Sequence, residues 1–197
     1  NGLKHGYGID YFTNGKIGYE GFYKNGNASG FGVCYLQDGY RFYIGYLDNG
    51  KRNGFGIYNG KHNLKMIGYW KDDQIFNGHY VRFNSDGSSY KGFVKNGKLY
   101  GYGIYKFDDG EIYEGEWVND QSHGYGIYKY NDGRIYKGEW KNDKKEGYGE
   151  ELIPGIRTYK GEWKNNKKEG YGMESFGNSN KYEYGIYKNG ILIEEIV

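Results

Sequence analysis

Four histidines and one cysteine are the residues of this chain that could bind a metal or act as a nucleophile. His5 and His123 occupy the same position of a repeated segment, five copies apart, which corresponds to about 50 Å at the usual spacing of strands. His62 and His79 have no cysteine or paired carboxylate at the spacing of zinc ligands. We therefore predict no metal site, and we interpret the histidines as turn residues.

Cys34 and the paired charges do not form a catalytic group either. Cys34 stands where other copies of the segment have tyrosine, and the sequence implies no neighbouring base that could activate it. Glu114 and Glu116, like Lys137 and Glu139, alternate along a strand, which is typical of a solvated face with weak cross-strand ion pairs. We expect no catalytic residue, no cofactor and no enzymatic activity.

The recurring Gly-Tyr-Gly element resembles a phosphate-binding loop or the filter of an ion channel in its composition. A phosphate-binding loop requires a following helix, and a filter requires flanking membrane helices. The sequence predicts neither, so we dismiss both functions.

Two sets of side chains could contact a partner. The first is an aromatic stripe that covers neighbouring glycines, forms a groove for a peptide or helix, or does both. The aromatic stripe consists of Tyr90, Tyr113, Trp117, Tyr136, Trp140, Tyr159 and Trp163. The second is a lysine edge that would bind anionic phosphoinositides or an acidic protein tail, although interleaved acidic residues favour a merely solubilising role. The lysine edge consists of Lys144, Lys145, Lys167 and Lys168, with Lys141 and Lys164 beside them.

The composition restricts the elements that can position these side chains. The 197 residues include 37 glycines and 26 tyrosines, and aromatic residues make up 20% of the chain. Leu, Ile and Val are scarce, so a thick two-layer core is excluded, while the many aromatic residues argue against disorder. No apolar run approaches the length of a membrane span, and no signal peptide is visible. The single cysteine fits a reducing compartment.

The chain repeats itself with a period of 23 or 24 residues. Each copy has a strand-opening residue, a glycine two positions later and a bulky residue two positions after that. The opening residues are Tyr19, Tyr43, Met66, Tyr90, Tyr113, Tyr136, Tyr159 and Glu183. Residues 1–18 form part of one more copy, and residues 183–197 form a final strand or cap. We expect one continuous array over residues 1–197, and we expect it to be a piece of something longer.

Alternation with period 2 predicts strands joined by hairpins. Asp132-Gly133 predicts a two-residue turn, and the loop at the other end of the hairpin, Asn119 to His123, is then expected to hold an odd number of residues. An extra residue between Gly39 and Tyr43 predicts a β-bulge. Counting outward from Asp132-Gly133, we expect one face to carry Tyr136, Gly138, Trp140, Tyr125 and Ile127. We expect the other face to carry Lys137, Glu139, Gly124, Gly126, Tyr128 and Tyr130.

The fold expected from these patterns is all-β: an elongated, single-layer antiparallel β-meander of hairpin repeats. About 16 strands would form a β-solenoid-like rod roughly 75 Å long. Aromatic rings that lie flat over glycines would replace a second packing layer.

These residues resemble the MORN repeat family (membrane occupation and recognition nexus). The segments YEGEWVNDQSHGYGIYKYNDGRIYKGEW and YKGEWKNDKKEGYGEELIPGIRTYKGEW match the family pattern closely, and the likeness covers nearly the whole chain. The resemblance implies elongated single-layer sheets without enzymatic activity of their own. Such arrays occur in junctophilins, ciliary radial spoke head proteins and parasite cytoskeletal proteins. They also occur as accessory regions of phosphoinositide kinases and of a histone methyltransferase.

Two segments depart from the repeat pattern. In residues 66–89, within the irregular region 59–89, the opener is methionine and Gly78-His79-Tyr80 replaces Gly-aromatic-Gly with an apparent shift of one residue. We expect a bend, an altered twist or a surface for a particular partner there. The tail from Ile191 to Val197 is aliphatic, and we expect it to cap the last strand or to dock onto a neighbour.

The expected function is a non-enzymatic scaffold for protein–protein interaction in a larger assembly, cytoskeletal or ciliary and similar to a radial spoke. Two alternatives are a membrane-tethering module that binds acidic phospholipids, and the regulatory region of a larger enzyme such as a phosphoinositide kinase. The expected partners are other proteins of a complex, including a helix or peptide in the aromatic groove, and a second copy through a sheet edge. Nucleic acid is not expected, because the net charge is only +2. We expect a cytoplasmic protein that associates with the cytoskeleton or a cilium.

Overall fold

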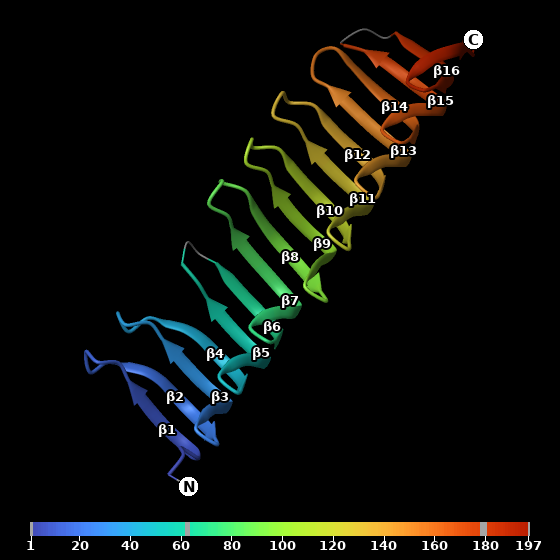
Figure 1. The fold of residues 1–197 in the computed structure, drawn as a ribbon. Coiled ribbons are helices and arrows are strands. Elements are labelled where there is room, and N and C mark those ends of the chain that lie inside the picture. The colour runs from blue at the N-terminus through green and yellow to red at the C-terminus, as the bar shows by residue number, and fades with distance from the viewer. Residues whose placement is uncertain (1, 62–63, 178–180, 197) are drawn as a thin grey trace. The chain divides into compact units, whose positions relative to one another are not determined.

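The computed structural model of the protein describes residues 2–61, 64–177 and 181–196. These residues form 17 strands and no helix, and the strands belong to one open antiparallel sheet (Figure 1). The all-β single-layer meander predicted from the sequence is therefore confirmed. The chain divides into two compact units: unit 1 comprises residues up to 83 with 91–98, and unit 2 comprises residues 84–90 with those from 99 onward.

In unit 1 each strand pairs antiparallel with the next one along the chain. Its strands are β1 (Gly6–Tyr11), β2 (Ile17–Lys24), β3 (Asn27–Tyr35), β4 (Arg41–Asp48), β5 (Lys51–Asn59), β6 (Lys65–Lys71) and β7 (Gln74–Phe83). Strand β8 (Ser89–Lys95) contributes residues to both units.

Unit 2 repeats the same arrangement, and consecutive strands from β9 onward pair antiparallel. Its strands are β9 (Lys98–Lys106), β10 (Ile112–Val118), β11 (Gln121–Lys129), β12 (Ile135–Lys141), β13 (Lys144–Ile153), β14 (Arg157–Lys164), β15 (Lys167–Phe176), β16 (Tyr182–Lys188) and β17 (Ile191–Glu195).

Two kinds of turn alternate, and the sequence prediction assigned them the wrong way round. Around Asp132-Gly133 the turn holds three residues, because the N–H of Tyr130 donates to the carbonyl oxygen of Arg134 at 2.9 Å and Gly133 has φ of 87°. At the other end of the hairpin, Asn119 and Asp120 form a two-residue turn with φ of 52° and 69°. Asn and Asp tolerate positive φ, so this pair replaces the usual Asn-Gly.

Because the turn lengths differ from the prediction, several residues lie on the opposite face of the sheet from the one predicted. Tyr128 lies opposite Tyr136 and Gly126 lies opposite Gly138, so these four residues share one face. We call it the inner face. Tyr125 was predicted to lie there together with Ile127, but both residues belong to the outer face, opposite Glu139 and Lys137.

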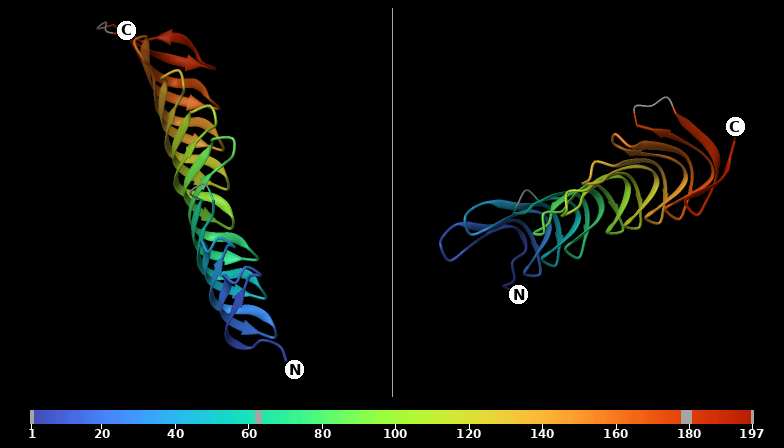
Figure 2. Two further views of the ribbon diagram at one scale, coloured as in Figure 1. Left: turned by 90° about the vertical axis from the view of Figure 1, so that its left-hand side faces the viewer. Right: turned by 90° about the horizontal axis from the view of Figure 1, so that it is seen from above.

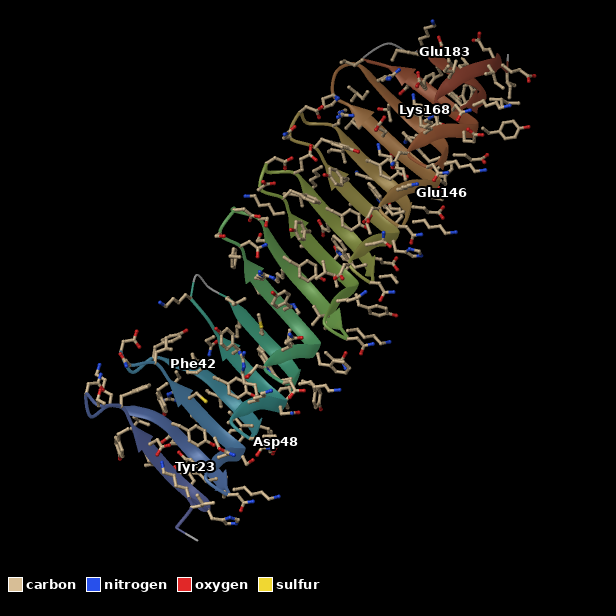
Figure 3. All side chains as sticks on the ribbon, viewed as in Figure 1. Tyr23, Phe42, Asp48, Glu146, Lys168 and Glu183 are labelled. Atoms are coloured by element: carbon tan, nitrogen blue, oxygen red, sulfur yellow. The ribbon has the colours of Figure 1, made fainter. Side chains whose placement is uncertain are left out.

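Bulges bend the strands. The bulge predicted between Gly39 and Tyr43 is confirmed: Cys34 lies opposite Tyr43 and Tyr35 lies opposite Arg41, which leaves Phe42 unpaired (labelled in Figure 3). A second irregularity follows the paired glycines in hairpins closed by the two-residue turn, as between Gly138 and Trp140. Because a bulge increases local bending, the strands curve within each hairpin (Figure 2).

Aromatic rings cover glycines on the inner face, as the sequence predicted. Tyr43, Tyr113, Tyr136 and Tyr159 are the largest side chains that are less than 2% exposed. A Cβ atom added at Gly126 would lie 2.5 Å from the hydroxyl oxygen of Tyr113, so no larger residue fits beneath that ring. The glycine and the ring therefore form one packing unit.

Residues 66–89 contain the predicted shift of one residue: Gly78 follows Gly68 by 10 residues, whereas Gly126 follows Gly115 by 11. Gly78 lies opposite Gly68, as Gly126 lies opposite Gly115, and therefore takes the place of the second glycine. Because Met66 replaces tyrosine, backbone atoms and no ring lie closest to these two glycines. In the second segment that departs from the repeat pattern, the aliphatic tail from Ile191 onward forms β17, which pairs with β16 and caps it, as predicted.

Candidate interaction surfaces

The aromatic stripe is buried. Tyr136 is 0% exposed, and the other six members are 1–7% exposed. The hydroxyl groups of Tyr113 and Tyr136 donate to backbone carbonyl oxygens three residues ahead, at 3.0 and 3.1 Å. The indole N–H of Trp140 donates to the carbonyl oxygen of Gly126 at 3.3 Å. Each of these three rings is therefore fixed both by packing and by a hydrogen bond.

The rings of the stripe contact one another from repeat to repeat. Tyr136 packs edge to face against Trp140 and Trp163, with centroid distances of 5.2 and 5.3 Å. Tyr159 continues the stack to Trp163 at 5.3 Å and to Tyr187 at 5.0 Å. Burial raises the pKa of these tyrosines, and that of Tyr187 to about 12. The stripe is the core of unit 2, and a partner on this face would meet the side chains that lie over it.

Two lysines of the predicted lysine edge lie over these rings. Lys145 and Lys168 are 7% and 8% exposed and do not lie on the surface edge, which corrects that part of the prediction. The Nζ atom of Lys145 is 4.7 Å from the ring centroids of Tyr136 and Trp163, and 2.5 Å from Oε1 of Glu151. Their neighbours in the sequence, Lys144 and Lys167, are exposed at the turns.

The same kind of ion pair, between a lysine and an acidic residue six positions later in the sequence, occurs in two other copies of the repeat. Lys168 forms an ion pair with Glu174 and lies 4.5 Å from the ring of Tyr159, and Lys4 forms an ion pair with Asp10. The same two positions hold neutral residues in other copies, as in Ser122/Tyr128 and Ala28/Cys34. A comparison of the copies at this spacing would have revealed the ion pairs from the sequence.

A cavity of about 440 Å³ opens on this face near the end of unit 2. It is lined by Arg134, Lys145, Glu151, Arg157, Trp163, Asn166, Lys167, Lys168, Glu174, Glu183, Tyr187, Gly190 and Leu192. Five of these side chains are basic and three are acidic, so the lining carries an excess of two positive charges. Figure 3 labels Lys168 and Glu183 among them. Glu174 forms ion pairs with Lys168 and, at 3.7 Å, with Arg157. The side chain of Arg157 is nevertheless 41% exposed, and Lys167 is exposed as well.

The outer face carries exposed rings, and one of them, Tyr125, was predicted to lie on the inner face. In unit 2 the central residue of each Gly-Tyr-Gly element is 55–64% exposed: Tyr102, Tyr125, Tyr148 and Tyr171. Glutamates flank these rings, and the carboxylate of Glu139, for example, accepts a hydrogen bond from the backbone N–H of Tyr148 at 2.9 Å. The aromatic residues that are accessible to a partner therefore lie opposite the predicted stripe.

Two of the four histidines and the cysteine lie in strands, whereas His5 precedes β1. His79 belongs to β7 and His123 to β11, so their assignment to turns was wrong, while His62 lies outside the described residues. No group of three possible metal ligands occurs among the described residues. Cys34 lies opposite Tyr43 in the position that Tyr58 holds in the next copy, as predicted, and burial raises the pKa of its thiol to about 11.

Seven segments of the chain match the model of the MORN repeat. They comprise residues 1–17, 19–39, 43–61, 90–112, 113–133, 136–154 and 159–181. The chain belongs to the MORN repeat family, and this membership indicates a repeat-based module that binds proteins or membranes. The family model leaves out residues 62–89 and those after 181, where the sequence departs from the repeat. A search among curated proteins gave no match. The described residues contain no helix long and apolar enough to cross a membrane.

Proposed function

We propose that the protein is a non-enzymatic scaffold that joins other proteins within a larger assembly. The observation that carries this proposal is the cavity on the inner face of unit 2, where Trp163 and Tyr187 provide apolar walls. Such a hollow accepts a side chain or a short segment of a partner, and aromatic residues are frequent anchors of protein interfaces.

The charges of the cavity favour an acidic peptide or the acidic side of a helix. Lys145 and Lys168 are already paired with Glu151 and Glu174 inside the sheet. Arg157 is 41% exposed in its side chain, so it can form charge-assisted hydrogen bonds with a carboxylate of the partner.

The test compares partners recovered from cell extract by three forms of the chain. In the first variant, Arg157→Glu is combined with Lys167→Glu, which reverses the charge at the cavity. The control variant carries Lys129→Glu on an exposed position outside the cavity. We expect the cavity variant to lose partners that the wild type and the control retain, as identified by mass spectrometry. Equal recovery by a folded cavity variant would refute the proposed binding site.

The cytoskeletal or ciliary setting of this scaffold is part of the same proposal and rests on the family resemblance. Localisation of the tagged full-length chain tests it, with enrichment at axonemes or cytoskeletal structures as the expected result. The alternative in which the array regulates a larger enzyme predicts a catalytic domain on the same full-length chain, such as a phosphoinositide kinase.

Membrane tethering is the second candidate function, and the exposed lysines at two successive turns favour it. They are Lys141, Lys144, Lys164 and Lys167. The N–H of Asn166 donates to the carbonyl oxygen of Lys145 at 3.1 Å, which fixes one turn against the next and aligns these lysines. Four cations suffice for weak attraction to an anionic leaflet. Sedimentation with phosphoinositide vesicles tests this function, and unchanged binding of the Lys144→Glu/Lys167→Glu variant would contradict it.

A further inference from the structure

The outer face of unit 1 carries two apolar rows, one of exposed aromatic rings and one of half-buried aliphatic side chains. The aromatic row consists of Tyr7, Phe22, Phe31, Tyr46, Phe55 and Tyr69. The aliphatic row consists of Val33, Ile44, Ile57 and Ile67, each directly opposite the next across the paired strands. Glu20 lies next in line, directly opposite Val33, and its carboxylate accepts a hydrogen bond from the hydroxyl of Tyr35 at 2.5 Å. This face is therefore an unpartnered apolar sheet surface.

The repeat itself does not require these residues to be apolar. In unit 2 the positions that correspond to Ile44 and Ile67 hold Lys137 and Lys160, and the positions that correspond to Tyr46 and Tyr69 hold glutamate. Both units nevertheless fold into the same hairpins. The apolar character is thus a property of the unit 1 surface and does not serve the fold.

The rings of the aromatic row are already ordered by one another. Tyr7 packs edge to face with Phe22 at a centroid distance of 5.9 Å. Phe31 packs in the same way with Tyr46, and Phe55 with Tyr69, each pair at 5.7 Å. Because each ring is held by its partner across the strands, little side-chain entropy is lost when a second surface covers it.

The exposed area matches what a stable dimer needs. The six rings are 46–63% exposed. Full burial of an aromatic side chain covers about 150–250 Å², so covering the exposed part of six rings removes roughly 600 Å² per copy from water. Two copies would bury roughly 1,200 Å², which reaches the lower limit of stable interfaces before the aliphatic row is counted. The largest apolar patch on a typical monomer measures about 300–600 Å² in all.

We propose that the outer face of unit 1 packs against the same face of a second copy of this chain. In this arrangement two sheets face each other about 10 Å apart and their side chains interdigitate, as in a β-sandwich. A two-fold axis brings the same surface to both sides, and the two apolar rows meet without opposing charges. The proposal goes beyond the scaffold function, because it assigns self-association to unit 1 and leaves the cavity of unit 2 available to other proteins.

The experiment measures the mass of the full chain by sedimentation equilibrium over a range of about 1–200 µM, which covers dissociation constants in the micromolar range. The variant Ile57→Lys places a charge in the aliphatic row. Its matched control is Ile127→Lys, since Ile127 holds the equivalent position in unit 2 beside Lys137 and Glu114. Circular dichroism checks that both variants remain folded, and Phe55→Ser with Tyr125→Ser provides a second matched pair.

We expect the wild type and the Ile127→Lys control to approach twice the monomer mass of 22.8 kDa as the concentration rises. The Ile57→Lys variant should require at least about tenfold more protein to reach the same dimer fraction, a loss of about 1.4 kcal/mol. The wild-type dimer should persist in high salt, because apolar contacts are not screened. A wild type that stays monomeric over the whole range would overturn the proposal, as would equal weakening by both lysine substitutions.

Discussion

The buried pair of Lys145 and Glu151 provides a direct test of how the inner face is built. In the neighbouring copy, the same two positions are occupied by Ser122 and Tyr128, which are neutral. We predict that the single substitutions Lys145→Ser and Glu151→Tyr each destabilise unit 2, whereas the double variant recovers most of the loss. The double variant transfers the neutral arrangement of one copy into the next.

The magnitude follows from the burial of the two charges. The side chains of Lys145 and Glu151 are 8% and 12% exposed. Removal of one partner leaves the other charge buried without its counter-ion, which costs about 3–5 kcal/mol. Lys145→Ser also removes contacts of the ammonium group with three rings, worth about 1 kcal/mol. Replacing both charges with residues that pack well is close to neutral, so we expect the double variant within about 1–2 kcal/mol of the wild type.

Urea unfolding followed by tryptophan fluorescence measures these differences, because Trp140 and Trp163 lie next to the pair. Hydrogen exchange of β12 to β14 gives the local stability, which matters because repeat arrays do not always unfold in one step. The reciprocal transfer, Ser122→Lys with Tyr128→Glu, is the control and should also be tolerated only as a double change. A double variant as unstable as the sum of its single changes would show that the ion pair and the neutral pair are not interchangeable.

Three further predictions concern individual groups. Gly126→Ala should destabilise unit 2 by at least about 1–3 kcal/mol in urea unfolding, because its Cβ would overlap the ring of Tyr113. Burial opposes ionisation of Asp73, but hydrogen bonds from Arg52 outweigh it and lower the pKa of Asp73 below 3.8. Stability from this carboxylate should be present above pH 3.8 and lost as the pH falls through its lowered pKa, and thermal unfolding of Asp73→Asn should depend less on pH there. Burial raises the pKa of Tyr19 from 10.0 to about 12, so the stability that its neutral form contributes should fall as the pH rises above 10. The phenolate absorbance of Tyr19, taken as the difference between the wild type and a Tyr19→Phe variant, should be small near pH 10 in the folded protein and increase on unfolding.

The sequence predicted the strands and the repeat period, but not which residues share a face. The strands follow from alternation, and the rings over glycines follow from a spacing of two residues. The faces depend on whether a loop holds two or three residues. Asp132-Gly133 is a common two-residue turn signal, yet its glycine also fits the last position of a three-residue loop. Asn119-Asp120 was not recognised as a turn, since it lacks the glycine that usually marks positive φ.

The same error explains what was missed at the candidate site. With the turn at Asn142-Asp143 fixed at two residues, Lys144 points outward and Lys145 points inward. The sequence shows two adjacent lysines, which look alike until the register is known. Burial then separates them into a surface charge and a core ion pair.

The two units differ in the residue types on their outer faces, where folding constrains the sequence least. On the inner face, a ring must cover a glycine, and the choice of residue is narrow. On the outer face, the same position holds Ile44 in unit 1 and Lys137 in unit 2, although both units have the same hairpins. A substitution that leaves the fold unchanged is free to respond to the surroundings of the protein. Folding does not require apolar residues on the outer face of unit 1, so we attribute them to contact with another apolar surface. This is the physical reason to seek a partner at that face.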